Sequence, residues 1–411
     1  MTGRVNVQES GDDRTRSAGP DRAEVRGRRA RLIEAARRHG AAGCCLFRPL
    51  TVFYLTGFAF IPTERPVALL LGDDGRSMLF VPRLEEEHAR QHAIVDEIVA
   101  YAEYPGKIHP MVHLEALIRD RGVGGSLAAD SDGYPGGFGY RGPALSDVLG
   151  TPVLSVAESA DLLMAVKSPS EIACLRESSR WASVAHDLLQ RAARPGQTEL
   201  EISEPASQAA TAQMVSTLGP AYRPHGWMTA GARAHFRGQI GAASAIPHSL
   251  ITNARIRPGD VLVTGATAAV AGYYSELERT MVVAPVSAEV ARLFRLMVGA
   301  QEVAREALRP GRPCAAVDRA VLDYFEQHDL MPHWRHHTGH AIGIGVPNHA
   351  APYLDIGDQT EIREGMVFSL EPGIYMPGLG GFRHSDTVLV TASGVEDLTH
   401  YPRDLENLTI G

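Results

Sequence analysis

The feature of the sequence that most constrains its fold is a change of pattern at residues 165–171, AVKSPSE. Before this segment short apolar runs alternate with helical stretches, and after it pairs of long helical stretches alternate with strands. Ser168-Pro169, with Glu171 in the first turn, predicts that a helix starts here. We therefore expect two units: an α/β unit first, and then an α+β unit with an antiparallel sheet.

The length of the chain agrees with this division. With 411 residues, 44% of them hydrophobic, the chain is long enough for two or three domains with cores of their own. Residues 1–23 contain almost no apolar anchor and are predicted to form a mobile tail. The expected organisation is a tail over 1–23, a smaller unit over 24–160 and a larger unit over 161–411.

Composition excludes several functional classes. The net charge of −8 is spread without a basic block, so we expect no nucleic-acid partner. No apolar run reaches the roughly 18 residues of a membrane span, and no signal-peptide core is present, which predicts a soluble protein without a membrane association. The four cysteines form neither a disulfide framework nor a zinc spacing, which indicates the cytoplasm. The first unit lacks the G-x-G-x-x-G motif of a dinucleotide site.

Five polar clusters interrupt the apolar pattern of the second unit. They are Ile246–His248, Gly272–Thr280, His336–Gly343, Met366–Gly373 and Gly381–Thr387. Strand alternation places Glu276 and Glu278 on one face, whereas His336 and His340 would share a face only on a helix, which the nearby glycines disfavour. Glu371 ends an apolar strand, so if it is buried it must face a cation, a donor or a cavity. Each cluster alone also fits an ordinary explanation, such as a solvated strand face or a polar turn.

Taken together and in this order, the clusters resemble the pita-bread family, which includes methionine aminopeptidase, aminopeptidase P, prolidase and creatinase. The segments GHAIGIG, APYLDIGD, EGMVFSLEPGIY and GVEDLTHYP are similar to the family's motifs, and residues 166–172 resemble the start of its catalytic half. The resemblance covers most of the chain. It implies an α+β pita-bread catalytic domain preceded by a smaller α/β creatinase/prolidase N-terminal domain.

The resemblance also places the metal-ligand positions of the peptidase members, which bind two ions through Asp, Asp, His, Glu and Glu. In this chain those positions hold Gly265, Glu276, His340, Glu371 and Ser385. Glycine has no side chain that could coordinate a metal, and serine is a poor ligand for a divalent cation. A site with two metal ions is therefore not expected.

Creatinase is the metal-free member, and its pattern fits the chain better. The resemblance places its acid/base histidine at His248 and its two substrate-binding glutamates at Glu278 and Glu371. One histidine can act in turn as base and acid, and two carboxylates can hold a cationic or N–H-rich group. We therefore predict a metal-independent C–N hydrolase of creatinase type, without a cofactor, that acts on a small guanidino, amidino or amide compound.

The resemblance implies further contacts around this site. His340, His349 and Ser385 are expected to contact the substrate. Arg65 resembles the arginine that creatinase lends to the active site of the neighbouring subunit. If Arg65 has that role, each site is shared between subunits, and the protein is a homodimer.

Two alternatives stay open. The first is a metallopeptidase of aminopeptidase P or prolidase type, with one Mn or Zn ion bound by Glu276, His340 and Glu371. The second is a non-catalytic member that binds peptides, as the peptidase-like domain of a histone chaperone does. Activity that requires added Mn²⁺ would select the first alternative, and peptide binding without turnover would select the second.

Overall fold

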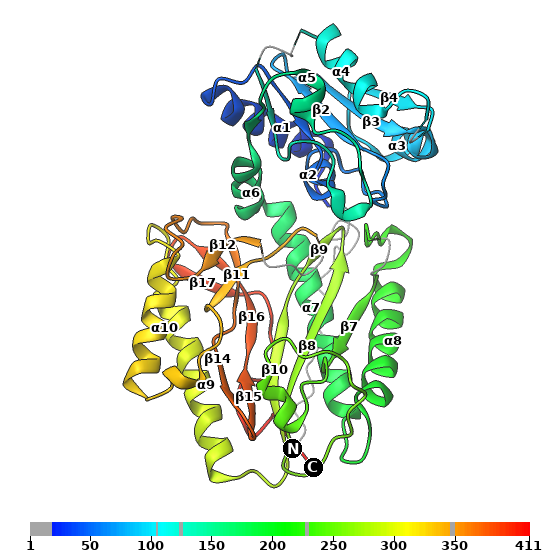
Figure 1. Ribbon diagram of the computed structural model, residues 1–411. Coiled ribbons are helices and arrows are strands. Elements are labelled where there is room, and N and C mark those ends of the chain that lie inside the picture. Colours follow the sequence, from blue (N-terminus) through cyan, green and yellow to red (C-terminus); the bar gives the residue numbers. More distant parts are fainter. Residues whose placement is uncertain (1–18, 104–105, 123–125, 227–229, 346–349) are drawn as a thin grey trace.

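The computed structural model describes residues 19–103, 106–122, 126–226, 230–345 and 350–411 (Figure 1). Figure 1 shows a smaller unit built from the N-terminal part of the chain above a larger unit built from the rest. Each unit has a hydrophobic core of its own. The predicted architecture, a smaller α/β unit followed by an α+β unit, is confirmed. The exact boundaries stay a prediction, and most of the predicted tail lies outside the described residues.

The smaller unit is a six-stranded mixed sheet with helices against it, in the strand order β4-β3-β2-β1-β5-β6. Its helices and strands are α1 (Arg22–Arg38), β1 (Gly43–Leu46), α2 (Pro49–Thr56), β2 (Ala68–Gly72), β3 (Ser77–Pro82), η1 (Arg83–Glu85), α3 (Glu86–His92), β4 (Glu97–Tyr101), α4 (Pro110–Asp120), β5 (Leu127–Ala129), η2 (Gly136–Phe138), α5 (Leu145–Leu149), β6 (Leu154–Ser155) and α6 (Ala157–Ala165). Strands β1, β2 and β3 are antiparallel, and β4, β5 and β6 pair in parallel with their neighbours. This mixture is the α/β character expected from the sequence.

The larger unit is built on a sheet whose central path runs β12-β11-β13-β16-β10-β8-β7. Its elements are α7 (Pro169–Ala192), α8 (Glu199–Leu218), η3 (Gly219–Ala221), β7 (Ala232–His235), η4 (Gly241–Ala245), β8 (Val261–Val270), β9 (Tyr273–Tyr274), β10 (Leu277–Val283), α9 (Ala288–Ala307), α10 (Ala315–Gln327), η5 (Met331–His333), β11 (Gly339–Ala341), β12 (Ala350–Leu354), β13 (Val367–Leu370), β14 (Gly373–Met376), β15 (Gly380–Arg383), β16 (Ser385–Thr391), β17 (Gly394–Asp397) and β18 (Thr409–Ile410). All pairings along this path are antiparallel. In Figure 1, helices α7 and α8 border β7 and β8, and α9 and α10 lie on the side of β14.

Local capping signals explain where the two long helices of the larger unit begin. The Ser168 hydroxyl accepts a hydrogen bond from the Glu171 N–H, and the Glu171 carboxylate accepts one from the Ser168 N–H. Thr198 and Glu201 form the same reciprocal pair at the start of α8. Such capping boxes satisfy N–H groups that have no partner within the helix. The helix start predicted from Ser168-Pro169 is confirmed.

Buried polar contacts of α1 join the two units. The Arg28 guanidinium donates to the Tyr273 hydroxyl (3.2 Å) and lies 3.3 Å from the Glu171 carboxylate. The Glu24 carboxylate accepts a hydrogen bond from the Ser168 hydroxyl at 2.6 Å. Since Glu171 and Ser168 belong to the start of α7, these contacts hold the smaller unit against the end of the larger unit where α7 begins. Among the described residues, no helix has the length and apolar character needed to cross a membrane.

The register of the large sheet determines which side chains share a face. Gly265 of β8 lies opposite His235 of β7 on one side and opposite Glu278 of β10 on the other. Glu278 in turn lies opposite Ser385 of β16. Directly paired residues project to the same face of a sheet. The side chains of His235, Glu278 and Ser385 therefore share one face.

Candidate metal centre

Three potential metal ligands from different parts of the larger unit converge. Glu276 lies in the break between β9 and β10, His340 lies on β11, and Glu371 directly follows β13. Their ligand atoms all lie within 4.8 Å of one another. The His340 Nε2 atom is 3.2 Å from Glu371 Oε1 and 3.9 Å from Glu276 Oε2. One imidazole nitrogen and two carboxylates thus point to a common position.

Hydrogen bonds orient these three side chains. The Nδ1 atom of His340 lies 3.0 Å from the carbonyl oxygen of Ala341, so Nδ1 is the protonated donor and Nε2 faces the carboxylates. The Ser385 hydroxyl donates to Glu276 Oε1 (2.6 Å), and the Ser369 hydroxyl donates to Glu371 Oε1 (3.4 Å). Ligands held in this way by outer hydrogen bonds are typical of metal sites in proteins. The residues present therefore fit a divalent cation.

The electrostatics of the cluster lead to the same conclusion. Burial, together with the nearby Glu371 carboxylate, raises the pKa of Glu276 to about 7. Burial alone would lower the pKa of His340, but its hydrogen bond to Glu371 and the charge of Glu276 raise it to about 9. Burial opposes ionisation of Glu371, yet His340 and Arg383 hold its pKa below the usual range. A cation bound here would interact favourably with both carboxylates and replace the proton on His340 Nε2.

A second charged group, centred on Glu278, lies beside this cluster. The Oε1 atom of Glu278 accepts hydrogen bonds from Arg237 Nη2 and Arg383 Nη2, both at 2.9 Å, and its Oε2 atom pairs with Arg383 Nε. Although Glu278 is buried, the two arginines hold its pKa below the usual range. Arg383 Nε also lies 3.8 Å from Glu371 Oε2. The two groups are therefore in direct electrostatic contact.

A chain of hydrogen bonds fixes the orientation of Arg383. Its Nη1 atom donates to the Tyr375 hydroxyl at 2.9 Å, and that hydroxyl lies 2.7 Å from His336 Nε2. The Nδ1 atom of His336 lies 2.8 Å from the carbonyl oxygen of His337. Burial lowers the pKa of His336, so its ring is neutral and Nε2 can accept a hydrogen bond from the Tyr375 hydroxyl. The guanidinium of Arg383 is thus held from two sides.

The two altered ligand positions have different surroundings. A Cβ atom at Gly265 would lie 2.6 Å from Cε1 of His235, so the imidazole fills the space that a side chain there would need. The Ser385 hydroxyl donates a hydrogen bond to Glu276 and thereby orients a ligand. In the part of the chain that the structure describes, Glu276, His340 and Glu371 form the only group of three or more such ligands close enough to hold an ion.

The other residues predicted from the sequence lie at different distances from the cluster. His248 lies in an exposed turn, but the carbonyl oxygen of its neighbour Pro247 accepts a hydrogen bond from Arg383 Nη1 at 3.4 Å. Arg65 belongs to the smaller unit, where it donates to Glu103 at 2.9 Å. His349 lies outside the described residues. The roles assigned to all of these residues stay predictions.

Several residues near the cluster were missed in the sequence. Arg383 belongs to the fifth polar cluster, but no role was assigned to it. The signal available for Arg383 was that it lies on a strand of buried residues, where a charge requires an opposite charge. Arg237, Tyr375 and His235 gave no such local signal, because their partners are distant in sequence.

Comparison with known proteins places the chain in a family. Residues 173–392 match the model of metallopeptidase family M24, and residues 28–140 match the creatinase/prolidase N-terminal domain. The chain is 30% identical over 387 residues to the probable dipeptidase PepE of Mycobacterium tuberculosis, covering 93% of this chain and 96% of the relative. The chain therefore belongs to metallopeptidase family M24.

Solved structures agree with the fold. The dipeptidase PepE from Mycobacterium ulcerans superposes with a TM-score of 0.79 at 26% identity, covering 95% of this chain and 100% of that one. The Xaa-Pro dipeptidase from Bacillus anthracis gives a TM-score of 0.79 at 23% identity, covering 94% of this chain and 100% of that one. The second likeness shows the fold alone.

These findings correct the main functional prediction. A metal-independent enzyme of creatinase type without a cofactor is wrong, because the family is one of metallopeptidases and Glu276, His340 and Glu371 converge as metal ligands do. The error came from Gly265 and Ser385, whose lack of carboxylates was interpreted as the loss of any metal. The broader prediction, a hydrolase of C–N bonds, is confirmed, since a peptide bond is such a bond.

Proposed function

We propose that the protein is a metal-dependent peptidase of the Xaa-Pro dipeptidase type that holds one divalent ion on Glu276, His340 and Glu371. The observation that carries the proposal is the convergence of these three ligands within 4.8 Å. One imidazole and two carboxylates suit Mn²⁺ well. The names of the relatives, dipeptidase PepE and Xaa-Pro dipeptidase, support a short peptide as the substrate.

Residues of this chain have separate roles around the ion. When bound, the ion would polarise the scissile carbonyl group and lower the pKa of a water molecule. Ser385 and Ser369 keep the two carboxylate ligands oriented, and Tyr375 keeps Arg383 beside Glu371. His248 is proposed to protonate the departing amine, and the contact of its neighbour Pro247 with Arg383 supports that role.

The test measures bound metal and peptide cleavage together. Purified protein is incubated with Mn²⁺ or Zn²⁺, dialysed, analysed for metal and assayed on Ala-Pro, before and after treatment with EDTA. We expect about one ion per chain, cleavage that stops with EDTA, and cleavage that returns when Mn²⁺ is added. The variant His340→Ala removes one ligand, and His39→Gln, at the exposed end of α1, is the matched histidine control.

Each outcome of this test decides something. Cleavage of Ala-Pro that survives EDTA and the His340→Ala substitution would contradict the proposal. Binding of Ala-Pro without turnover, at full metal occupancy, would instead select the non-catalytic alternative.

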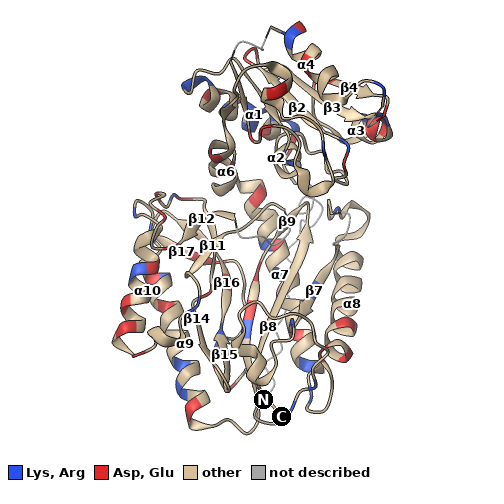
Figure 2. Cartoon of the chain, in the orientation of Figure 1, with Lys and Arg blue, Asp and Glu red and all other residues tan. Residues whose placement is uncertain are grey.

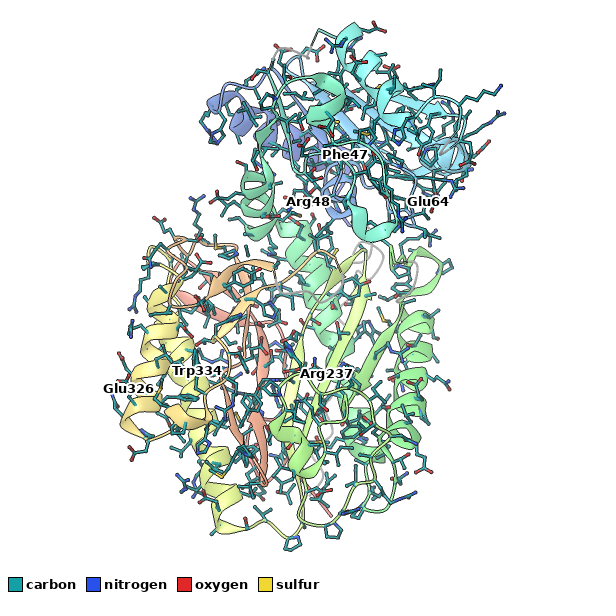
Figure 3. All side chains as sticks on the ribbon, in the orientation of Figure 1. Phe47, Arg48, Glu64, Arg237, Glu326 and Trp334 are labelled. Atoms are coloured by element: carbon teal, nitrogen blue, oxygen red, sulfur yellow. The ribbon has the colours of Figure 1, made fainter. Side chains whose placement is uncertain are left out.

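We further propose that the protein is a cytoplasmic homodimer. Exposed apolar side chains at Ile246 (54%), Leu250 (81%) and Ile251 (59%) flank the turn of His248, and such a patch commonly marks an interface. In Figure 3, Glu64, the neighbour of Arg65, lies on the side of the smaller unit nearer the larger unit. The four cysteines are free and buried, which supports a reducing compartment. Light scattering of Leu250→Ser and wild-type protein tests the dimer.

A further inference from the structure

Arg237 differs from the other arginine that binds Glu278. Its side chain is 36% exposed, whereas that of Arg383 is 3% exposed. Among the described residues, the partners of Arg237 are Glu278 and Gln239, and both accept from Nη2. The Nε and Nη1 donors of Arg237 therefore have no partner in the described part of the chain. Figure 3 labels Arg237 in the middle of the larger unit, beside β8 and β10.

Arg383, by contrast, has no such donors to offer. Its Nε and Nη2 atoms are bound to Glu278, and its Nη1 atom donates to the Tyr375 hydroxyl and to the Pro247 carbonyl. Arg383 is shared between Glu278 and, at 3.8 Å, Glu371. The guanidinium with unused donors is therefore that of Arg237, the more exposed of the two.

The backbone around Arg237 is held in an unusual conformation. Arg237 has a φ of +52°, in the left-handed region that non-glycine residues rarely adopt. A Cβ atom on the next residue, Gly238, would lie 2.0 Å from the carbonyl oxygen of Leu250, so only glycine allows this approach. Strained conformations of this kind persist where the surrounding structure enforces them, often at functional sites. Here the strained turn places a long cationic side chain beside the metal cluster.

We propose that Arg237 binds the C-terminal carboxylate of the peptide substrate and so restricts the enzyme to short peptides. The inference rests on the proposed peptidase function. Arg237 is linked to the ligand Glu371 by three contacts, through Glu278 and Arg383, at 2.9, 2.9 and 3.8 Å. Only a short peptide fits between a scissile bond at the metal cluster and a carboxylate bound by a side chain this close to it. A guanidinium with two unused donors matches a carboxylate in charge and shape.

The test compares a free carboxylate with an uncharged end group. Mn²⁺-treated wild-type protein and the variants Arg237→Gln and Arg237→Lys are assayed on Ala-Pro and on its C-terminal amide. For wild type we expect KM to be about 10- to 100-fold higher for the amide, as the loss of a charge-assisted hydrogen bond predicts. In Arg237→Gln this preference disappears because KM for Ala-Pro rises, while kcat changes little. Arg237→Lys restores part of the preference.

A matched control removes the same charge from β7, the strand that ends just before Arg237. Arg233 of β7 is exposed and pairs with Glu204 at 3.1 Å, so Arg233→Gln should keep the full preference for the free carboxylate. Binding of both peptides to EDTA-treated protein, measured by calorimetry, gives a readout that does not depend on turnover. There too, Arg237→Gln should bind Ala-Pro and its amide equally.

The outcomes separate this inference from the proposed function. Equal KM values for Ala-Pro and its amide in wild type, with normal turnover, would overturn the role of Arg237 and leave the peptidase intact. An Arg237-dependent preference in binding, without any turnover, would support the carboxylate site and contradict the peptidase. A preference that Arg233→Gln reduces as strongly as Arg237→Gln would also overturn the inference.

Discussion

Buried charged groups on the two faces of strands β10 and β16 differ in whether the protein itself supplies their partners. On one face, Ser385 donates a hydrogen bond to the metal ligand Glu276, which directly precedes β10, and Glu278 lies beside the candidate metal centre. On the other face, Arg279 and Asp386 form an ion pair of 2.8 Å, with 0% and 2% of their side chains exposed. The same two strands therefore carry an ion pair that the protein satisfies internally on one face, and on the other face they border the carboxylates that it leaves for a ligand.

The ion pair of Arg279 and Asp386 is completed by further hydrogen bonds. Asp386 also accepts hydrogen bonds from Thr399 at 2.8 Å and from Gln301 at 3.1 Å. Burial opposes ionisation of Asp386, but Arg279 lowers its pKa to about 2. At the metal centre, in contrast, two carboxylates face one imidazole, and the pKa of Glu276 rises to about 7 through burial and the charge of Glu371. The difference shows that buried charge by itself does not mark a binding site, whereas a surplus of like charge does. Figure 2 shows acidic and basic positions on neighbouring strands in the middle of the larger unit.

The largest expected effect separates the two faces by activity. His340→Ala removes the nitrogen ligand, and we expect kcat/KM on Ala-Pro to fall by more than about 100-fold, since even outer hydrogen-bond partners of a metal site contribute about 10- to 100-fold. The thermal unfolding midpoint of the metal-free variant should stay close to that of wild type. A lower unfolding midpoint in this variant would show instead that the residues on this face also stabilise the fold.

The next effect concerns stability. Asp386→Asn leaves Arg279 buried without its counter-charge, and we expect the free energy of unfolding to fall by about 3–5 kcal/mol. Chemical denaturation followed by circular dichroism measures the loss. The control is Glu396→Gln, which breaks an exposed pair with Arg176 and should cost less than about 1 kcal/mol. Similar losses of unfolding free energy in both variants would show that the buried Arg279–Asp386 pair stabilises the fold no more than an exposed pair does.

The sequence predicted local structure well because the signals were local. The capping pattern at Ser168 and Glu171 predicted the start of α7. The ligands Glu276, His340 and Glu371 were also found, as an alternative, because the motifs around them resemble those of a known family.

The rest could not be found because it depends on pairs distant in sequence. Arg237 and Glu278 are 41 residues apart, and no periodicity relates them. The pattern around Glu278 therefore suggested a carboxylate open to substrate, although two guanidinium groups already bind it. Whether a side chain would fit at position 265 likewise depends on His235, which lies on another strand.

A smaller effect concerns the buried histidine His384 and the pH dependence of stability. Burial, with the charge of Arg279 nearby, lowers the pKa of His384 to about 3, and its Nδ1 atom accepts a hydrogen bond from the Thr280 N–H. The unfolded chain binds this proton near pH 6.5, so stability is lost as pH falls from about 6.5 towards 3, by about 1.4 kcal/mol per pH unit. We expect His384→Asn to lose about 2 kcal/mol less than wild type between pH 6.5 and 5. Denaturation curves at both pH values measure this difference, and equal losses would contradict it.

The smallest expected effect tests whether the His235 imidazole occupies the space that a side chain at position 265 would need. Gly265→Ala places a Cβ atom 2.6 Å from His235 Cε1, so the imidazole must move, and we expect a loss of about 1–2 kcal/mol in unfolding free energy. In the double variant with His235→Ala, the space is free and the penalty of the alanine should vanish. Gly136→Ala is the control, since a Cβ atom there meets nothing within 4 Å and its φ is not in the left-handed region. Because residues in contact couple energetically, the double-mutant cycle should give a coupling of about 1 kcal/mol, and strict additivity would show that the imidazole does not occupy that space.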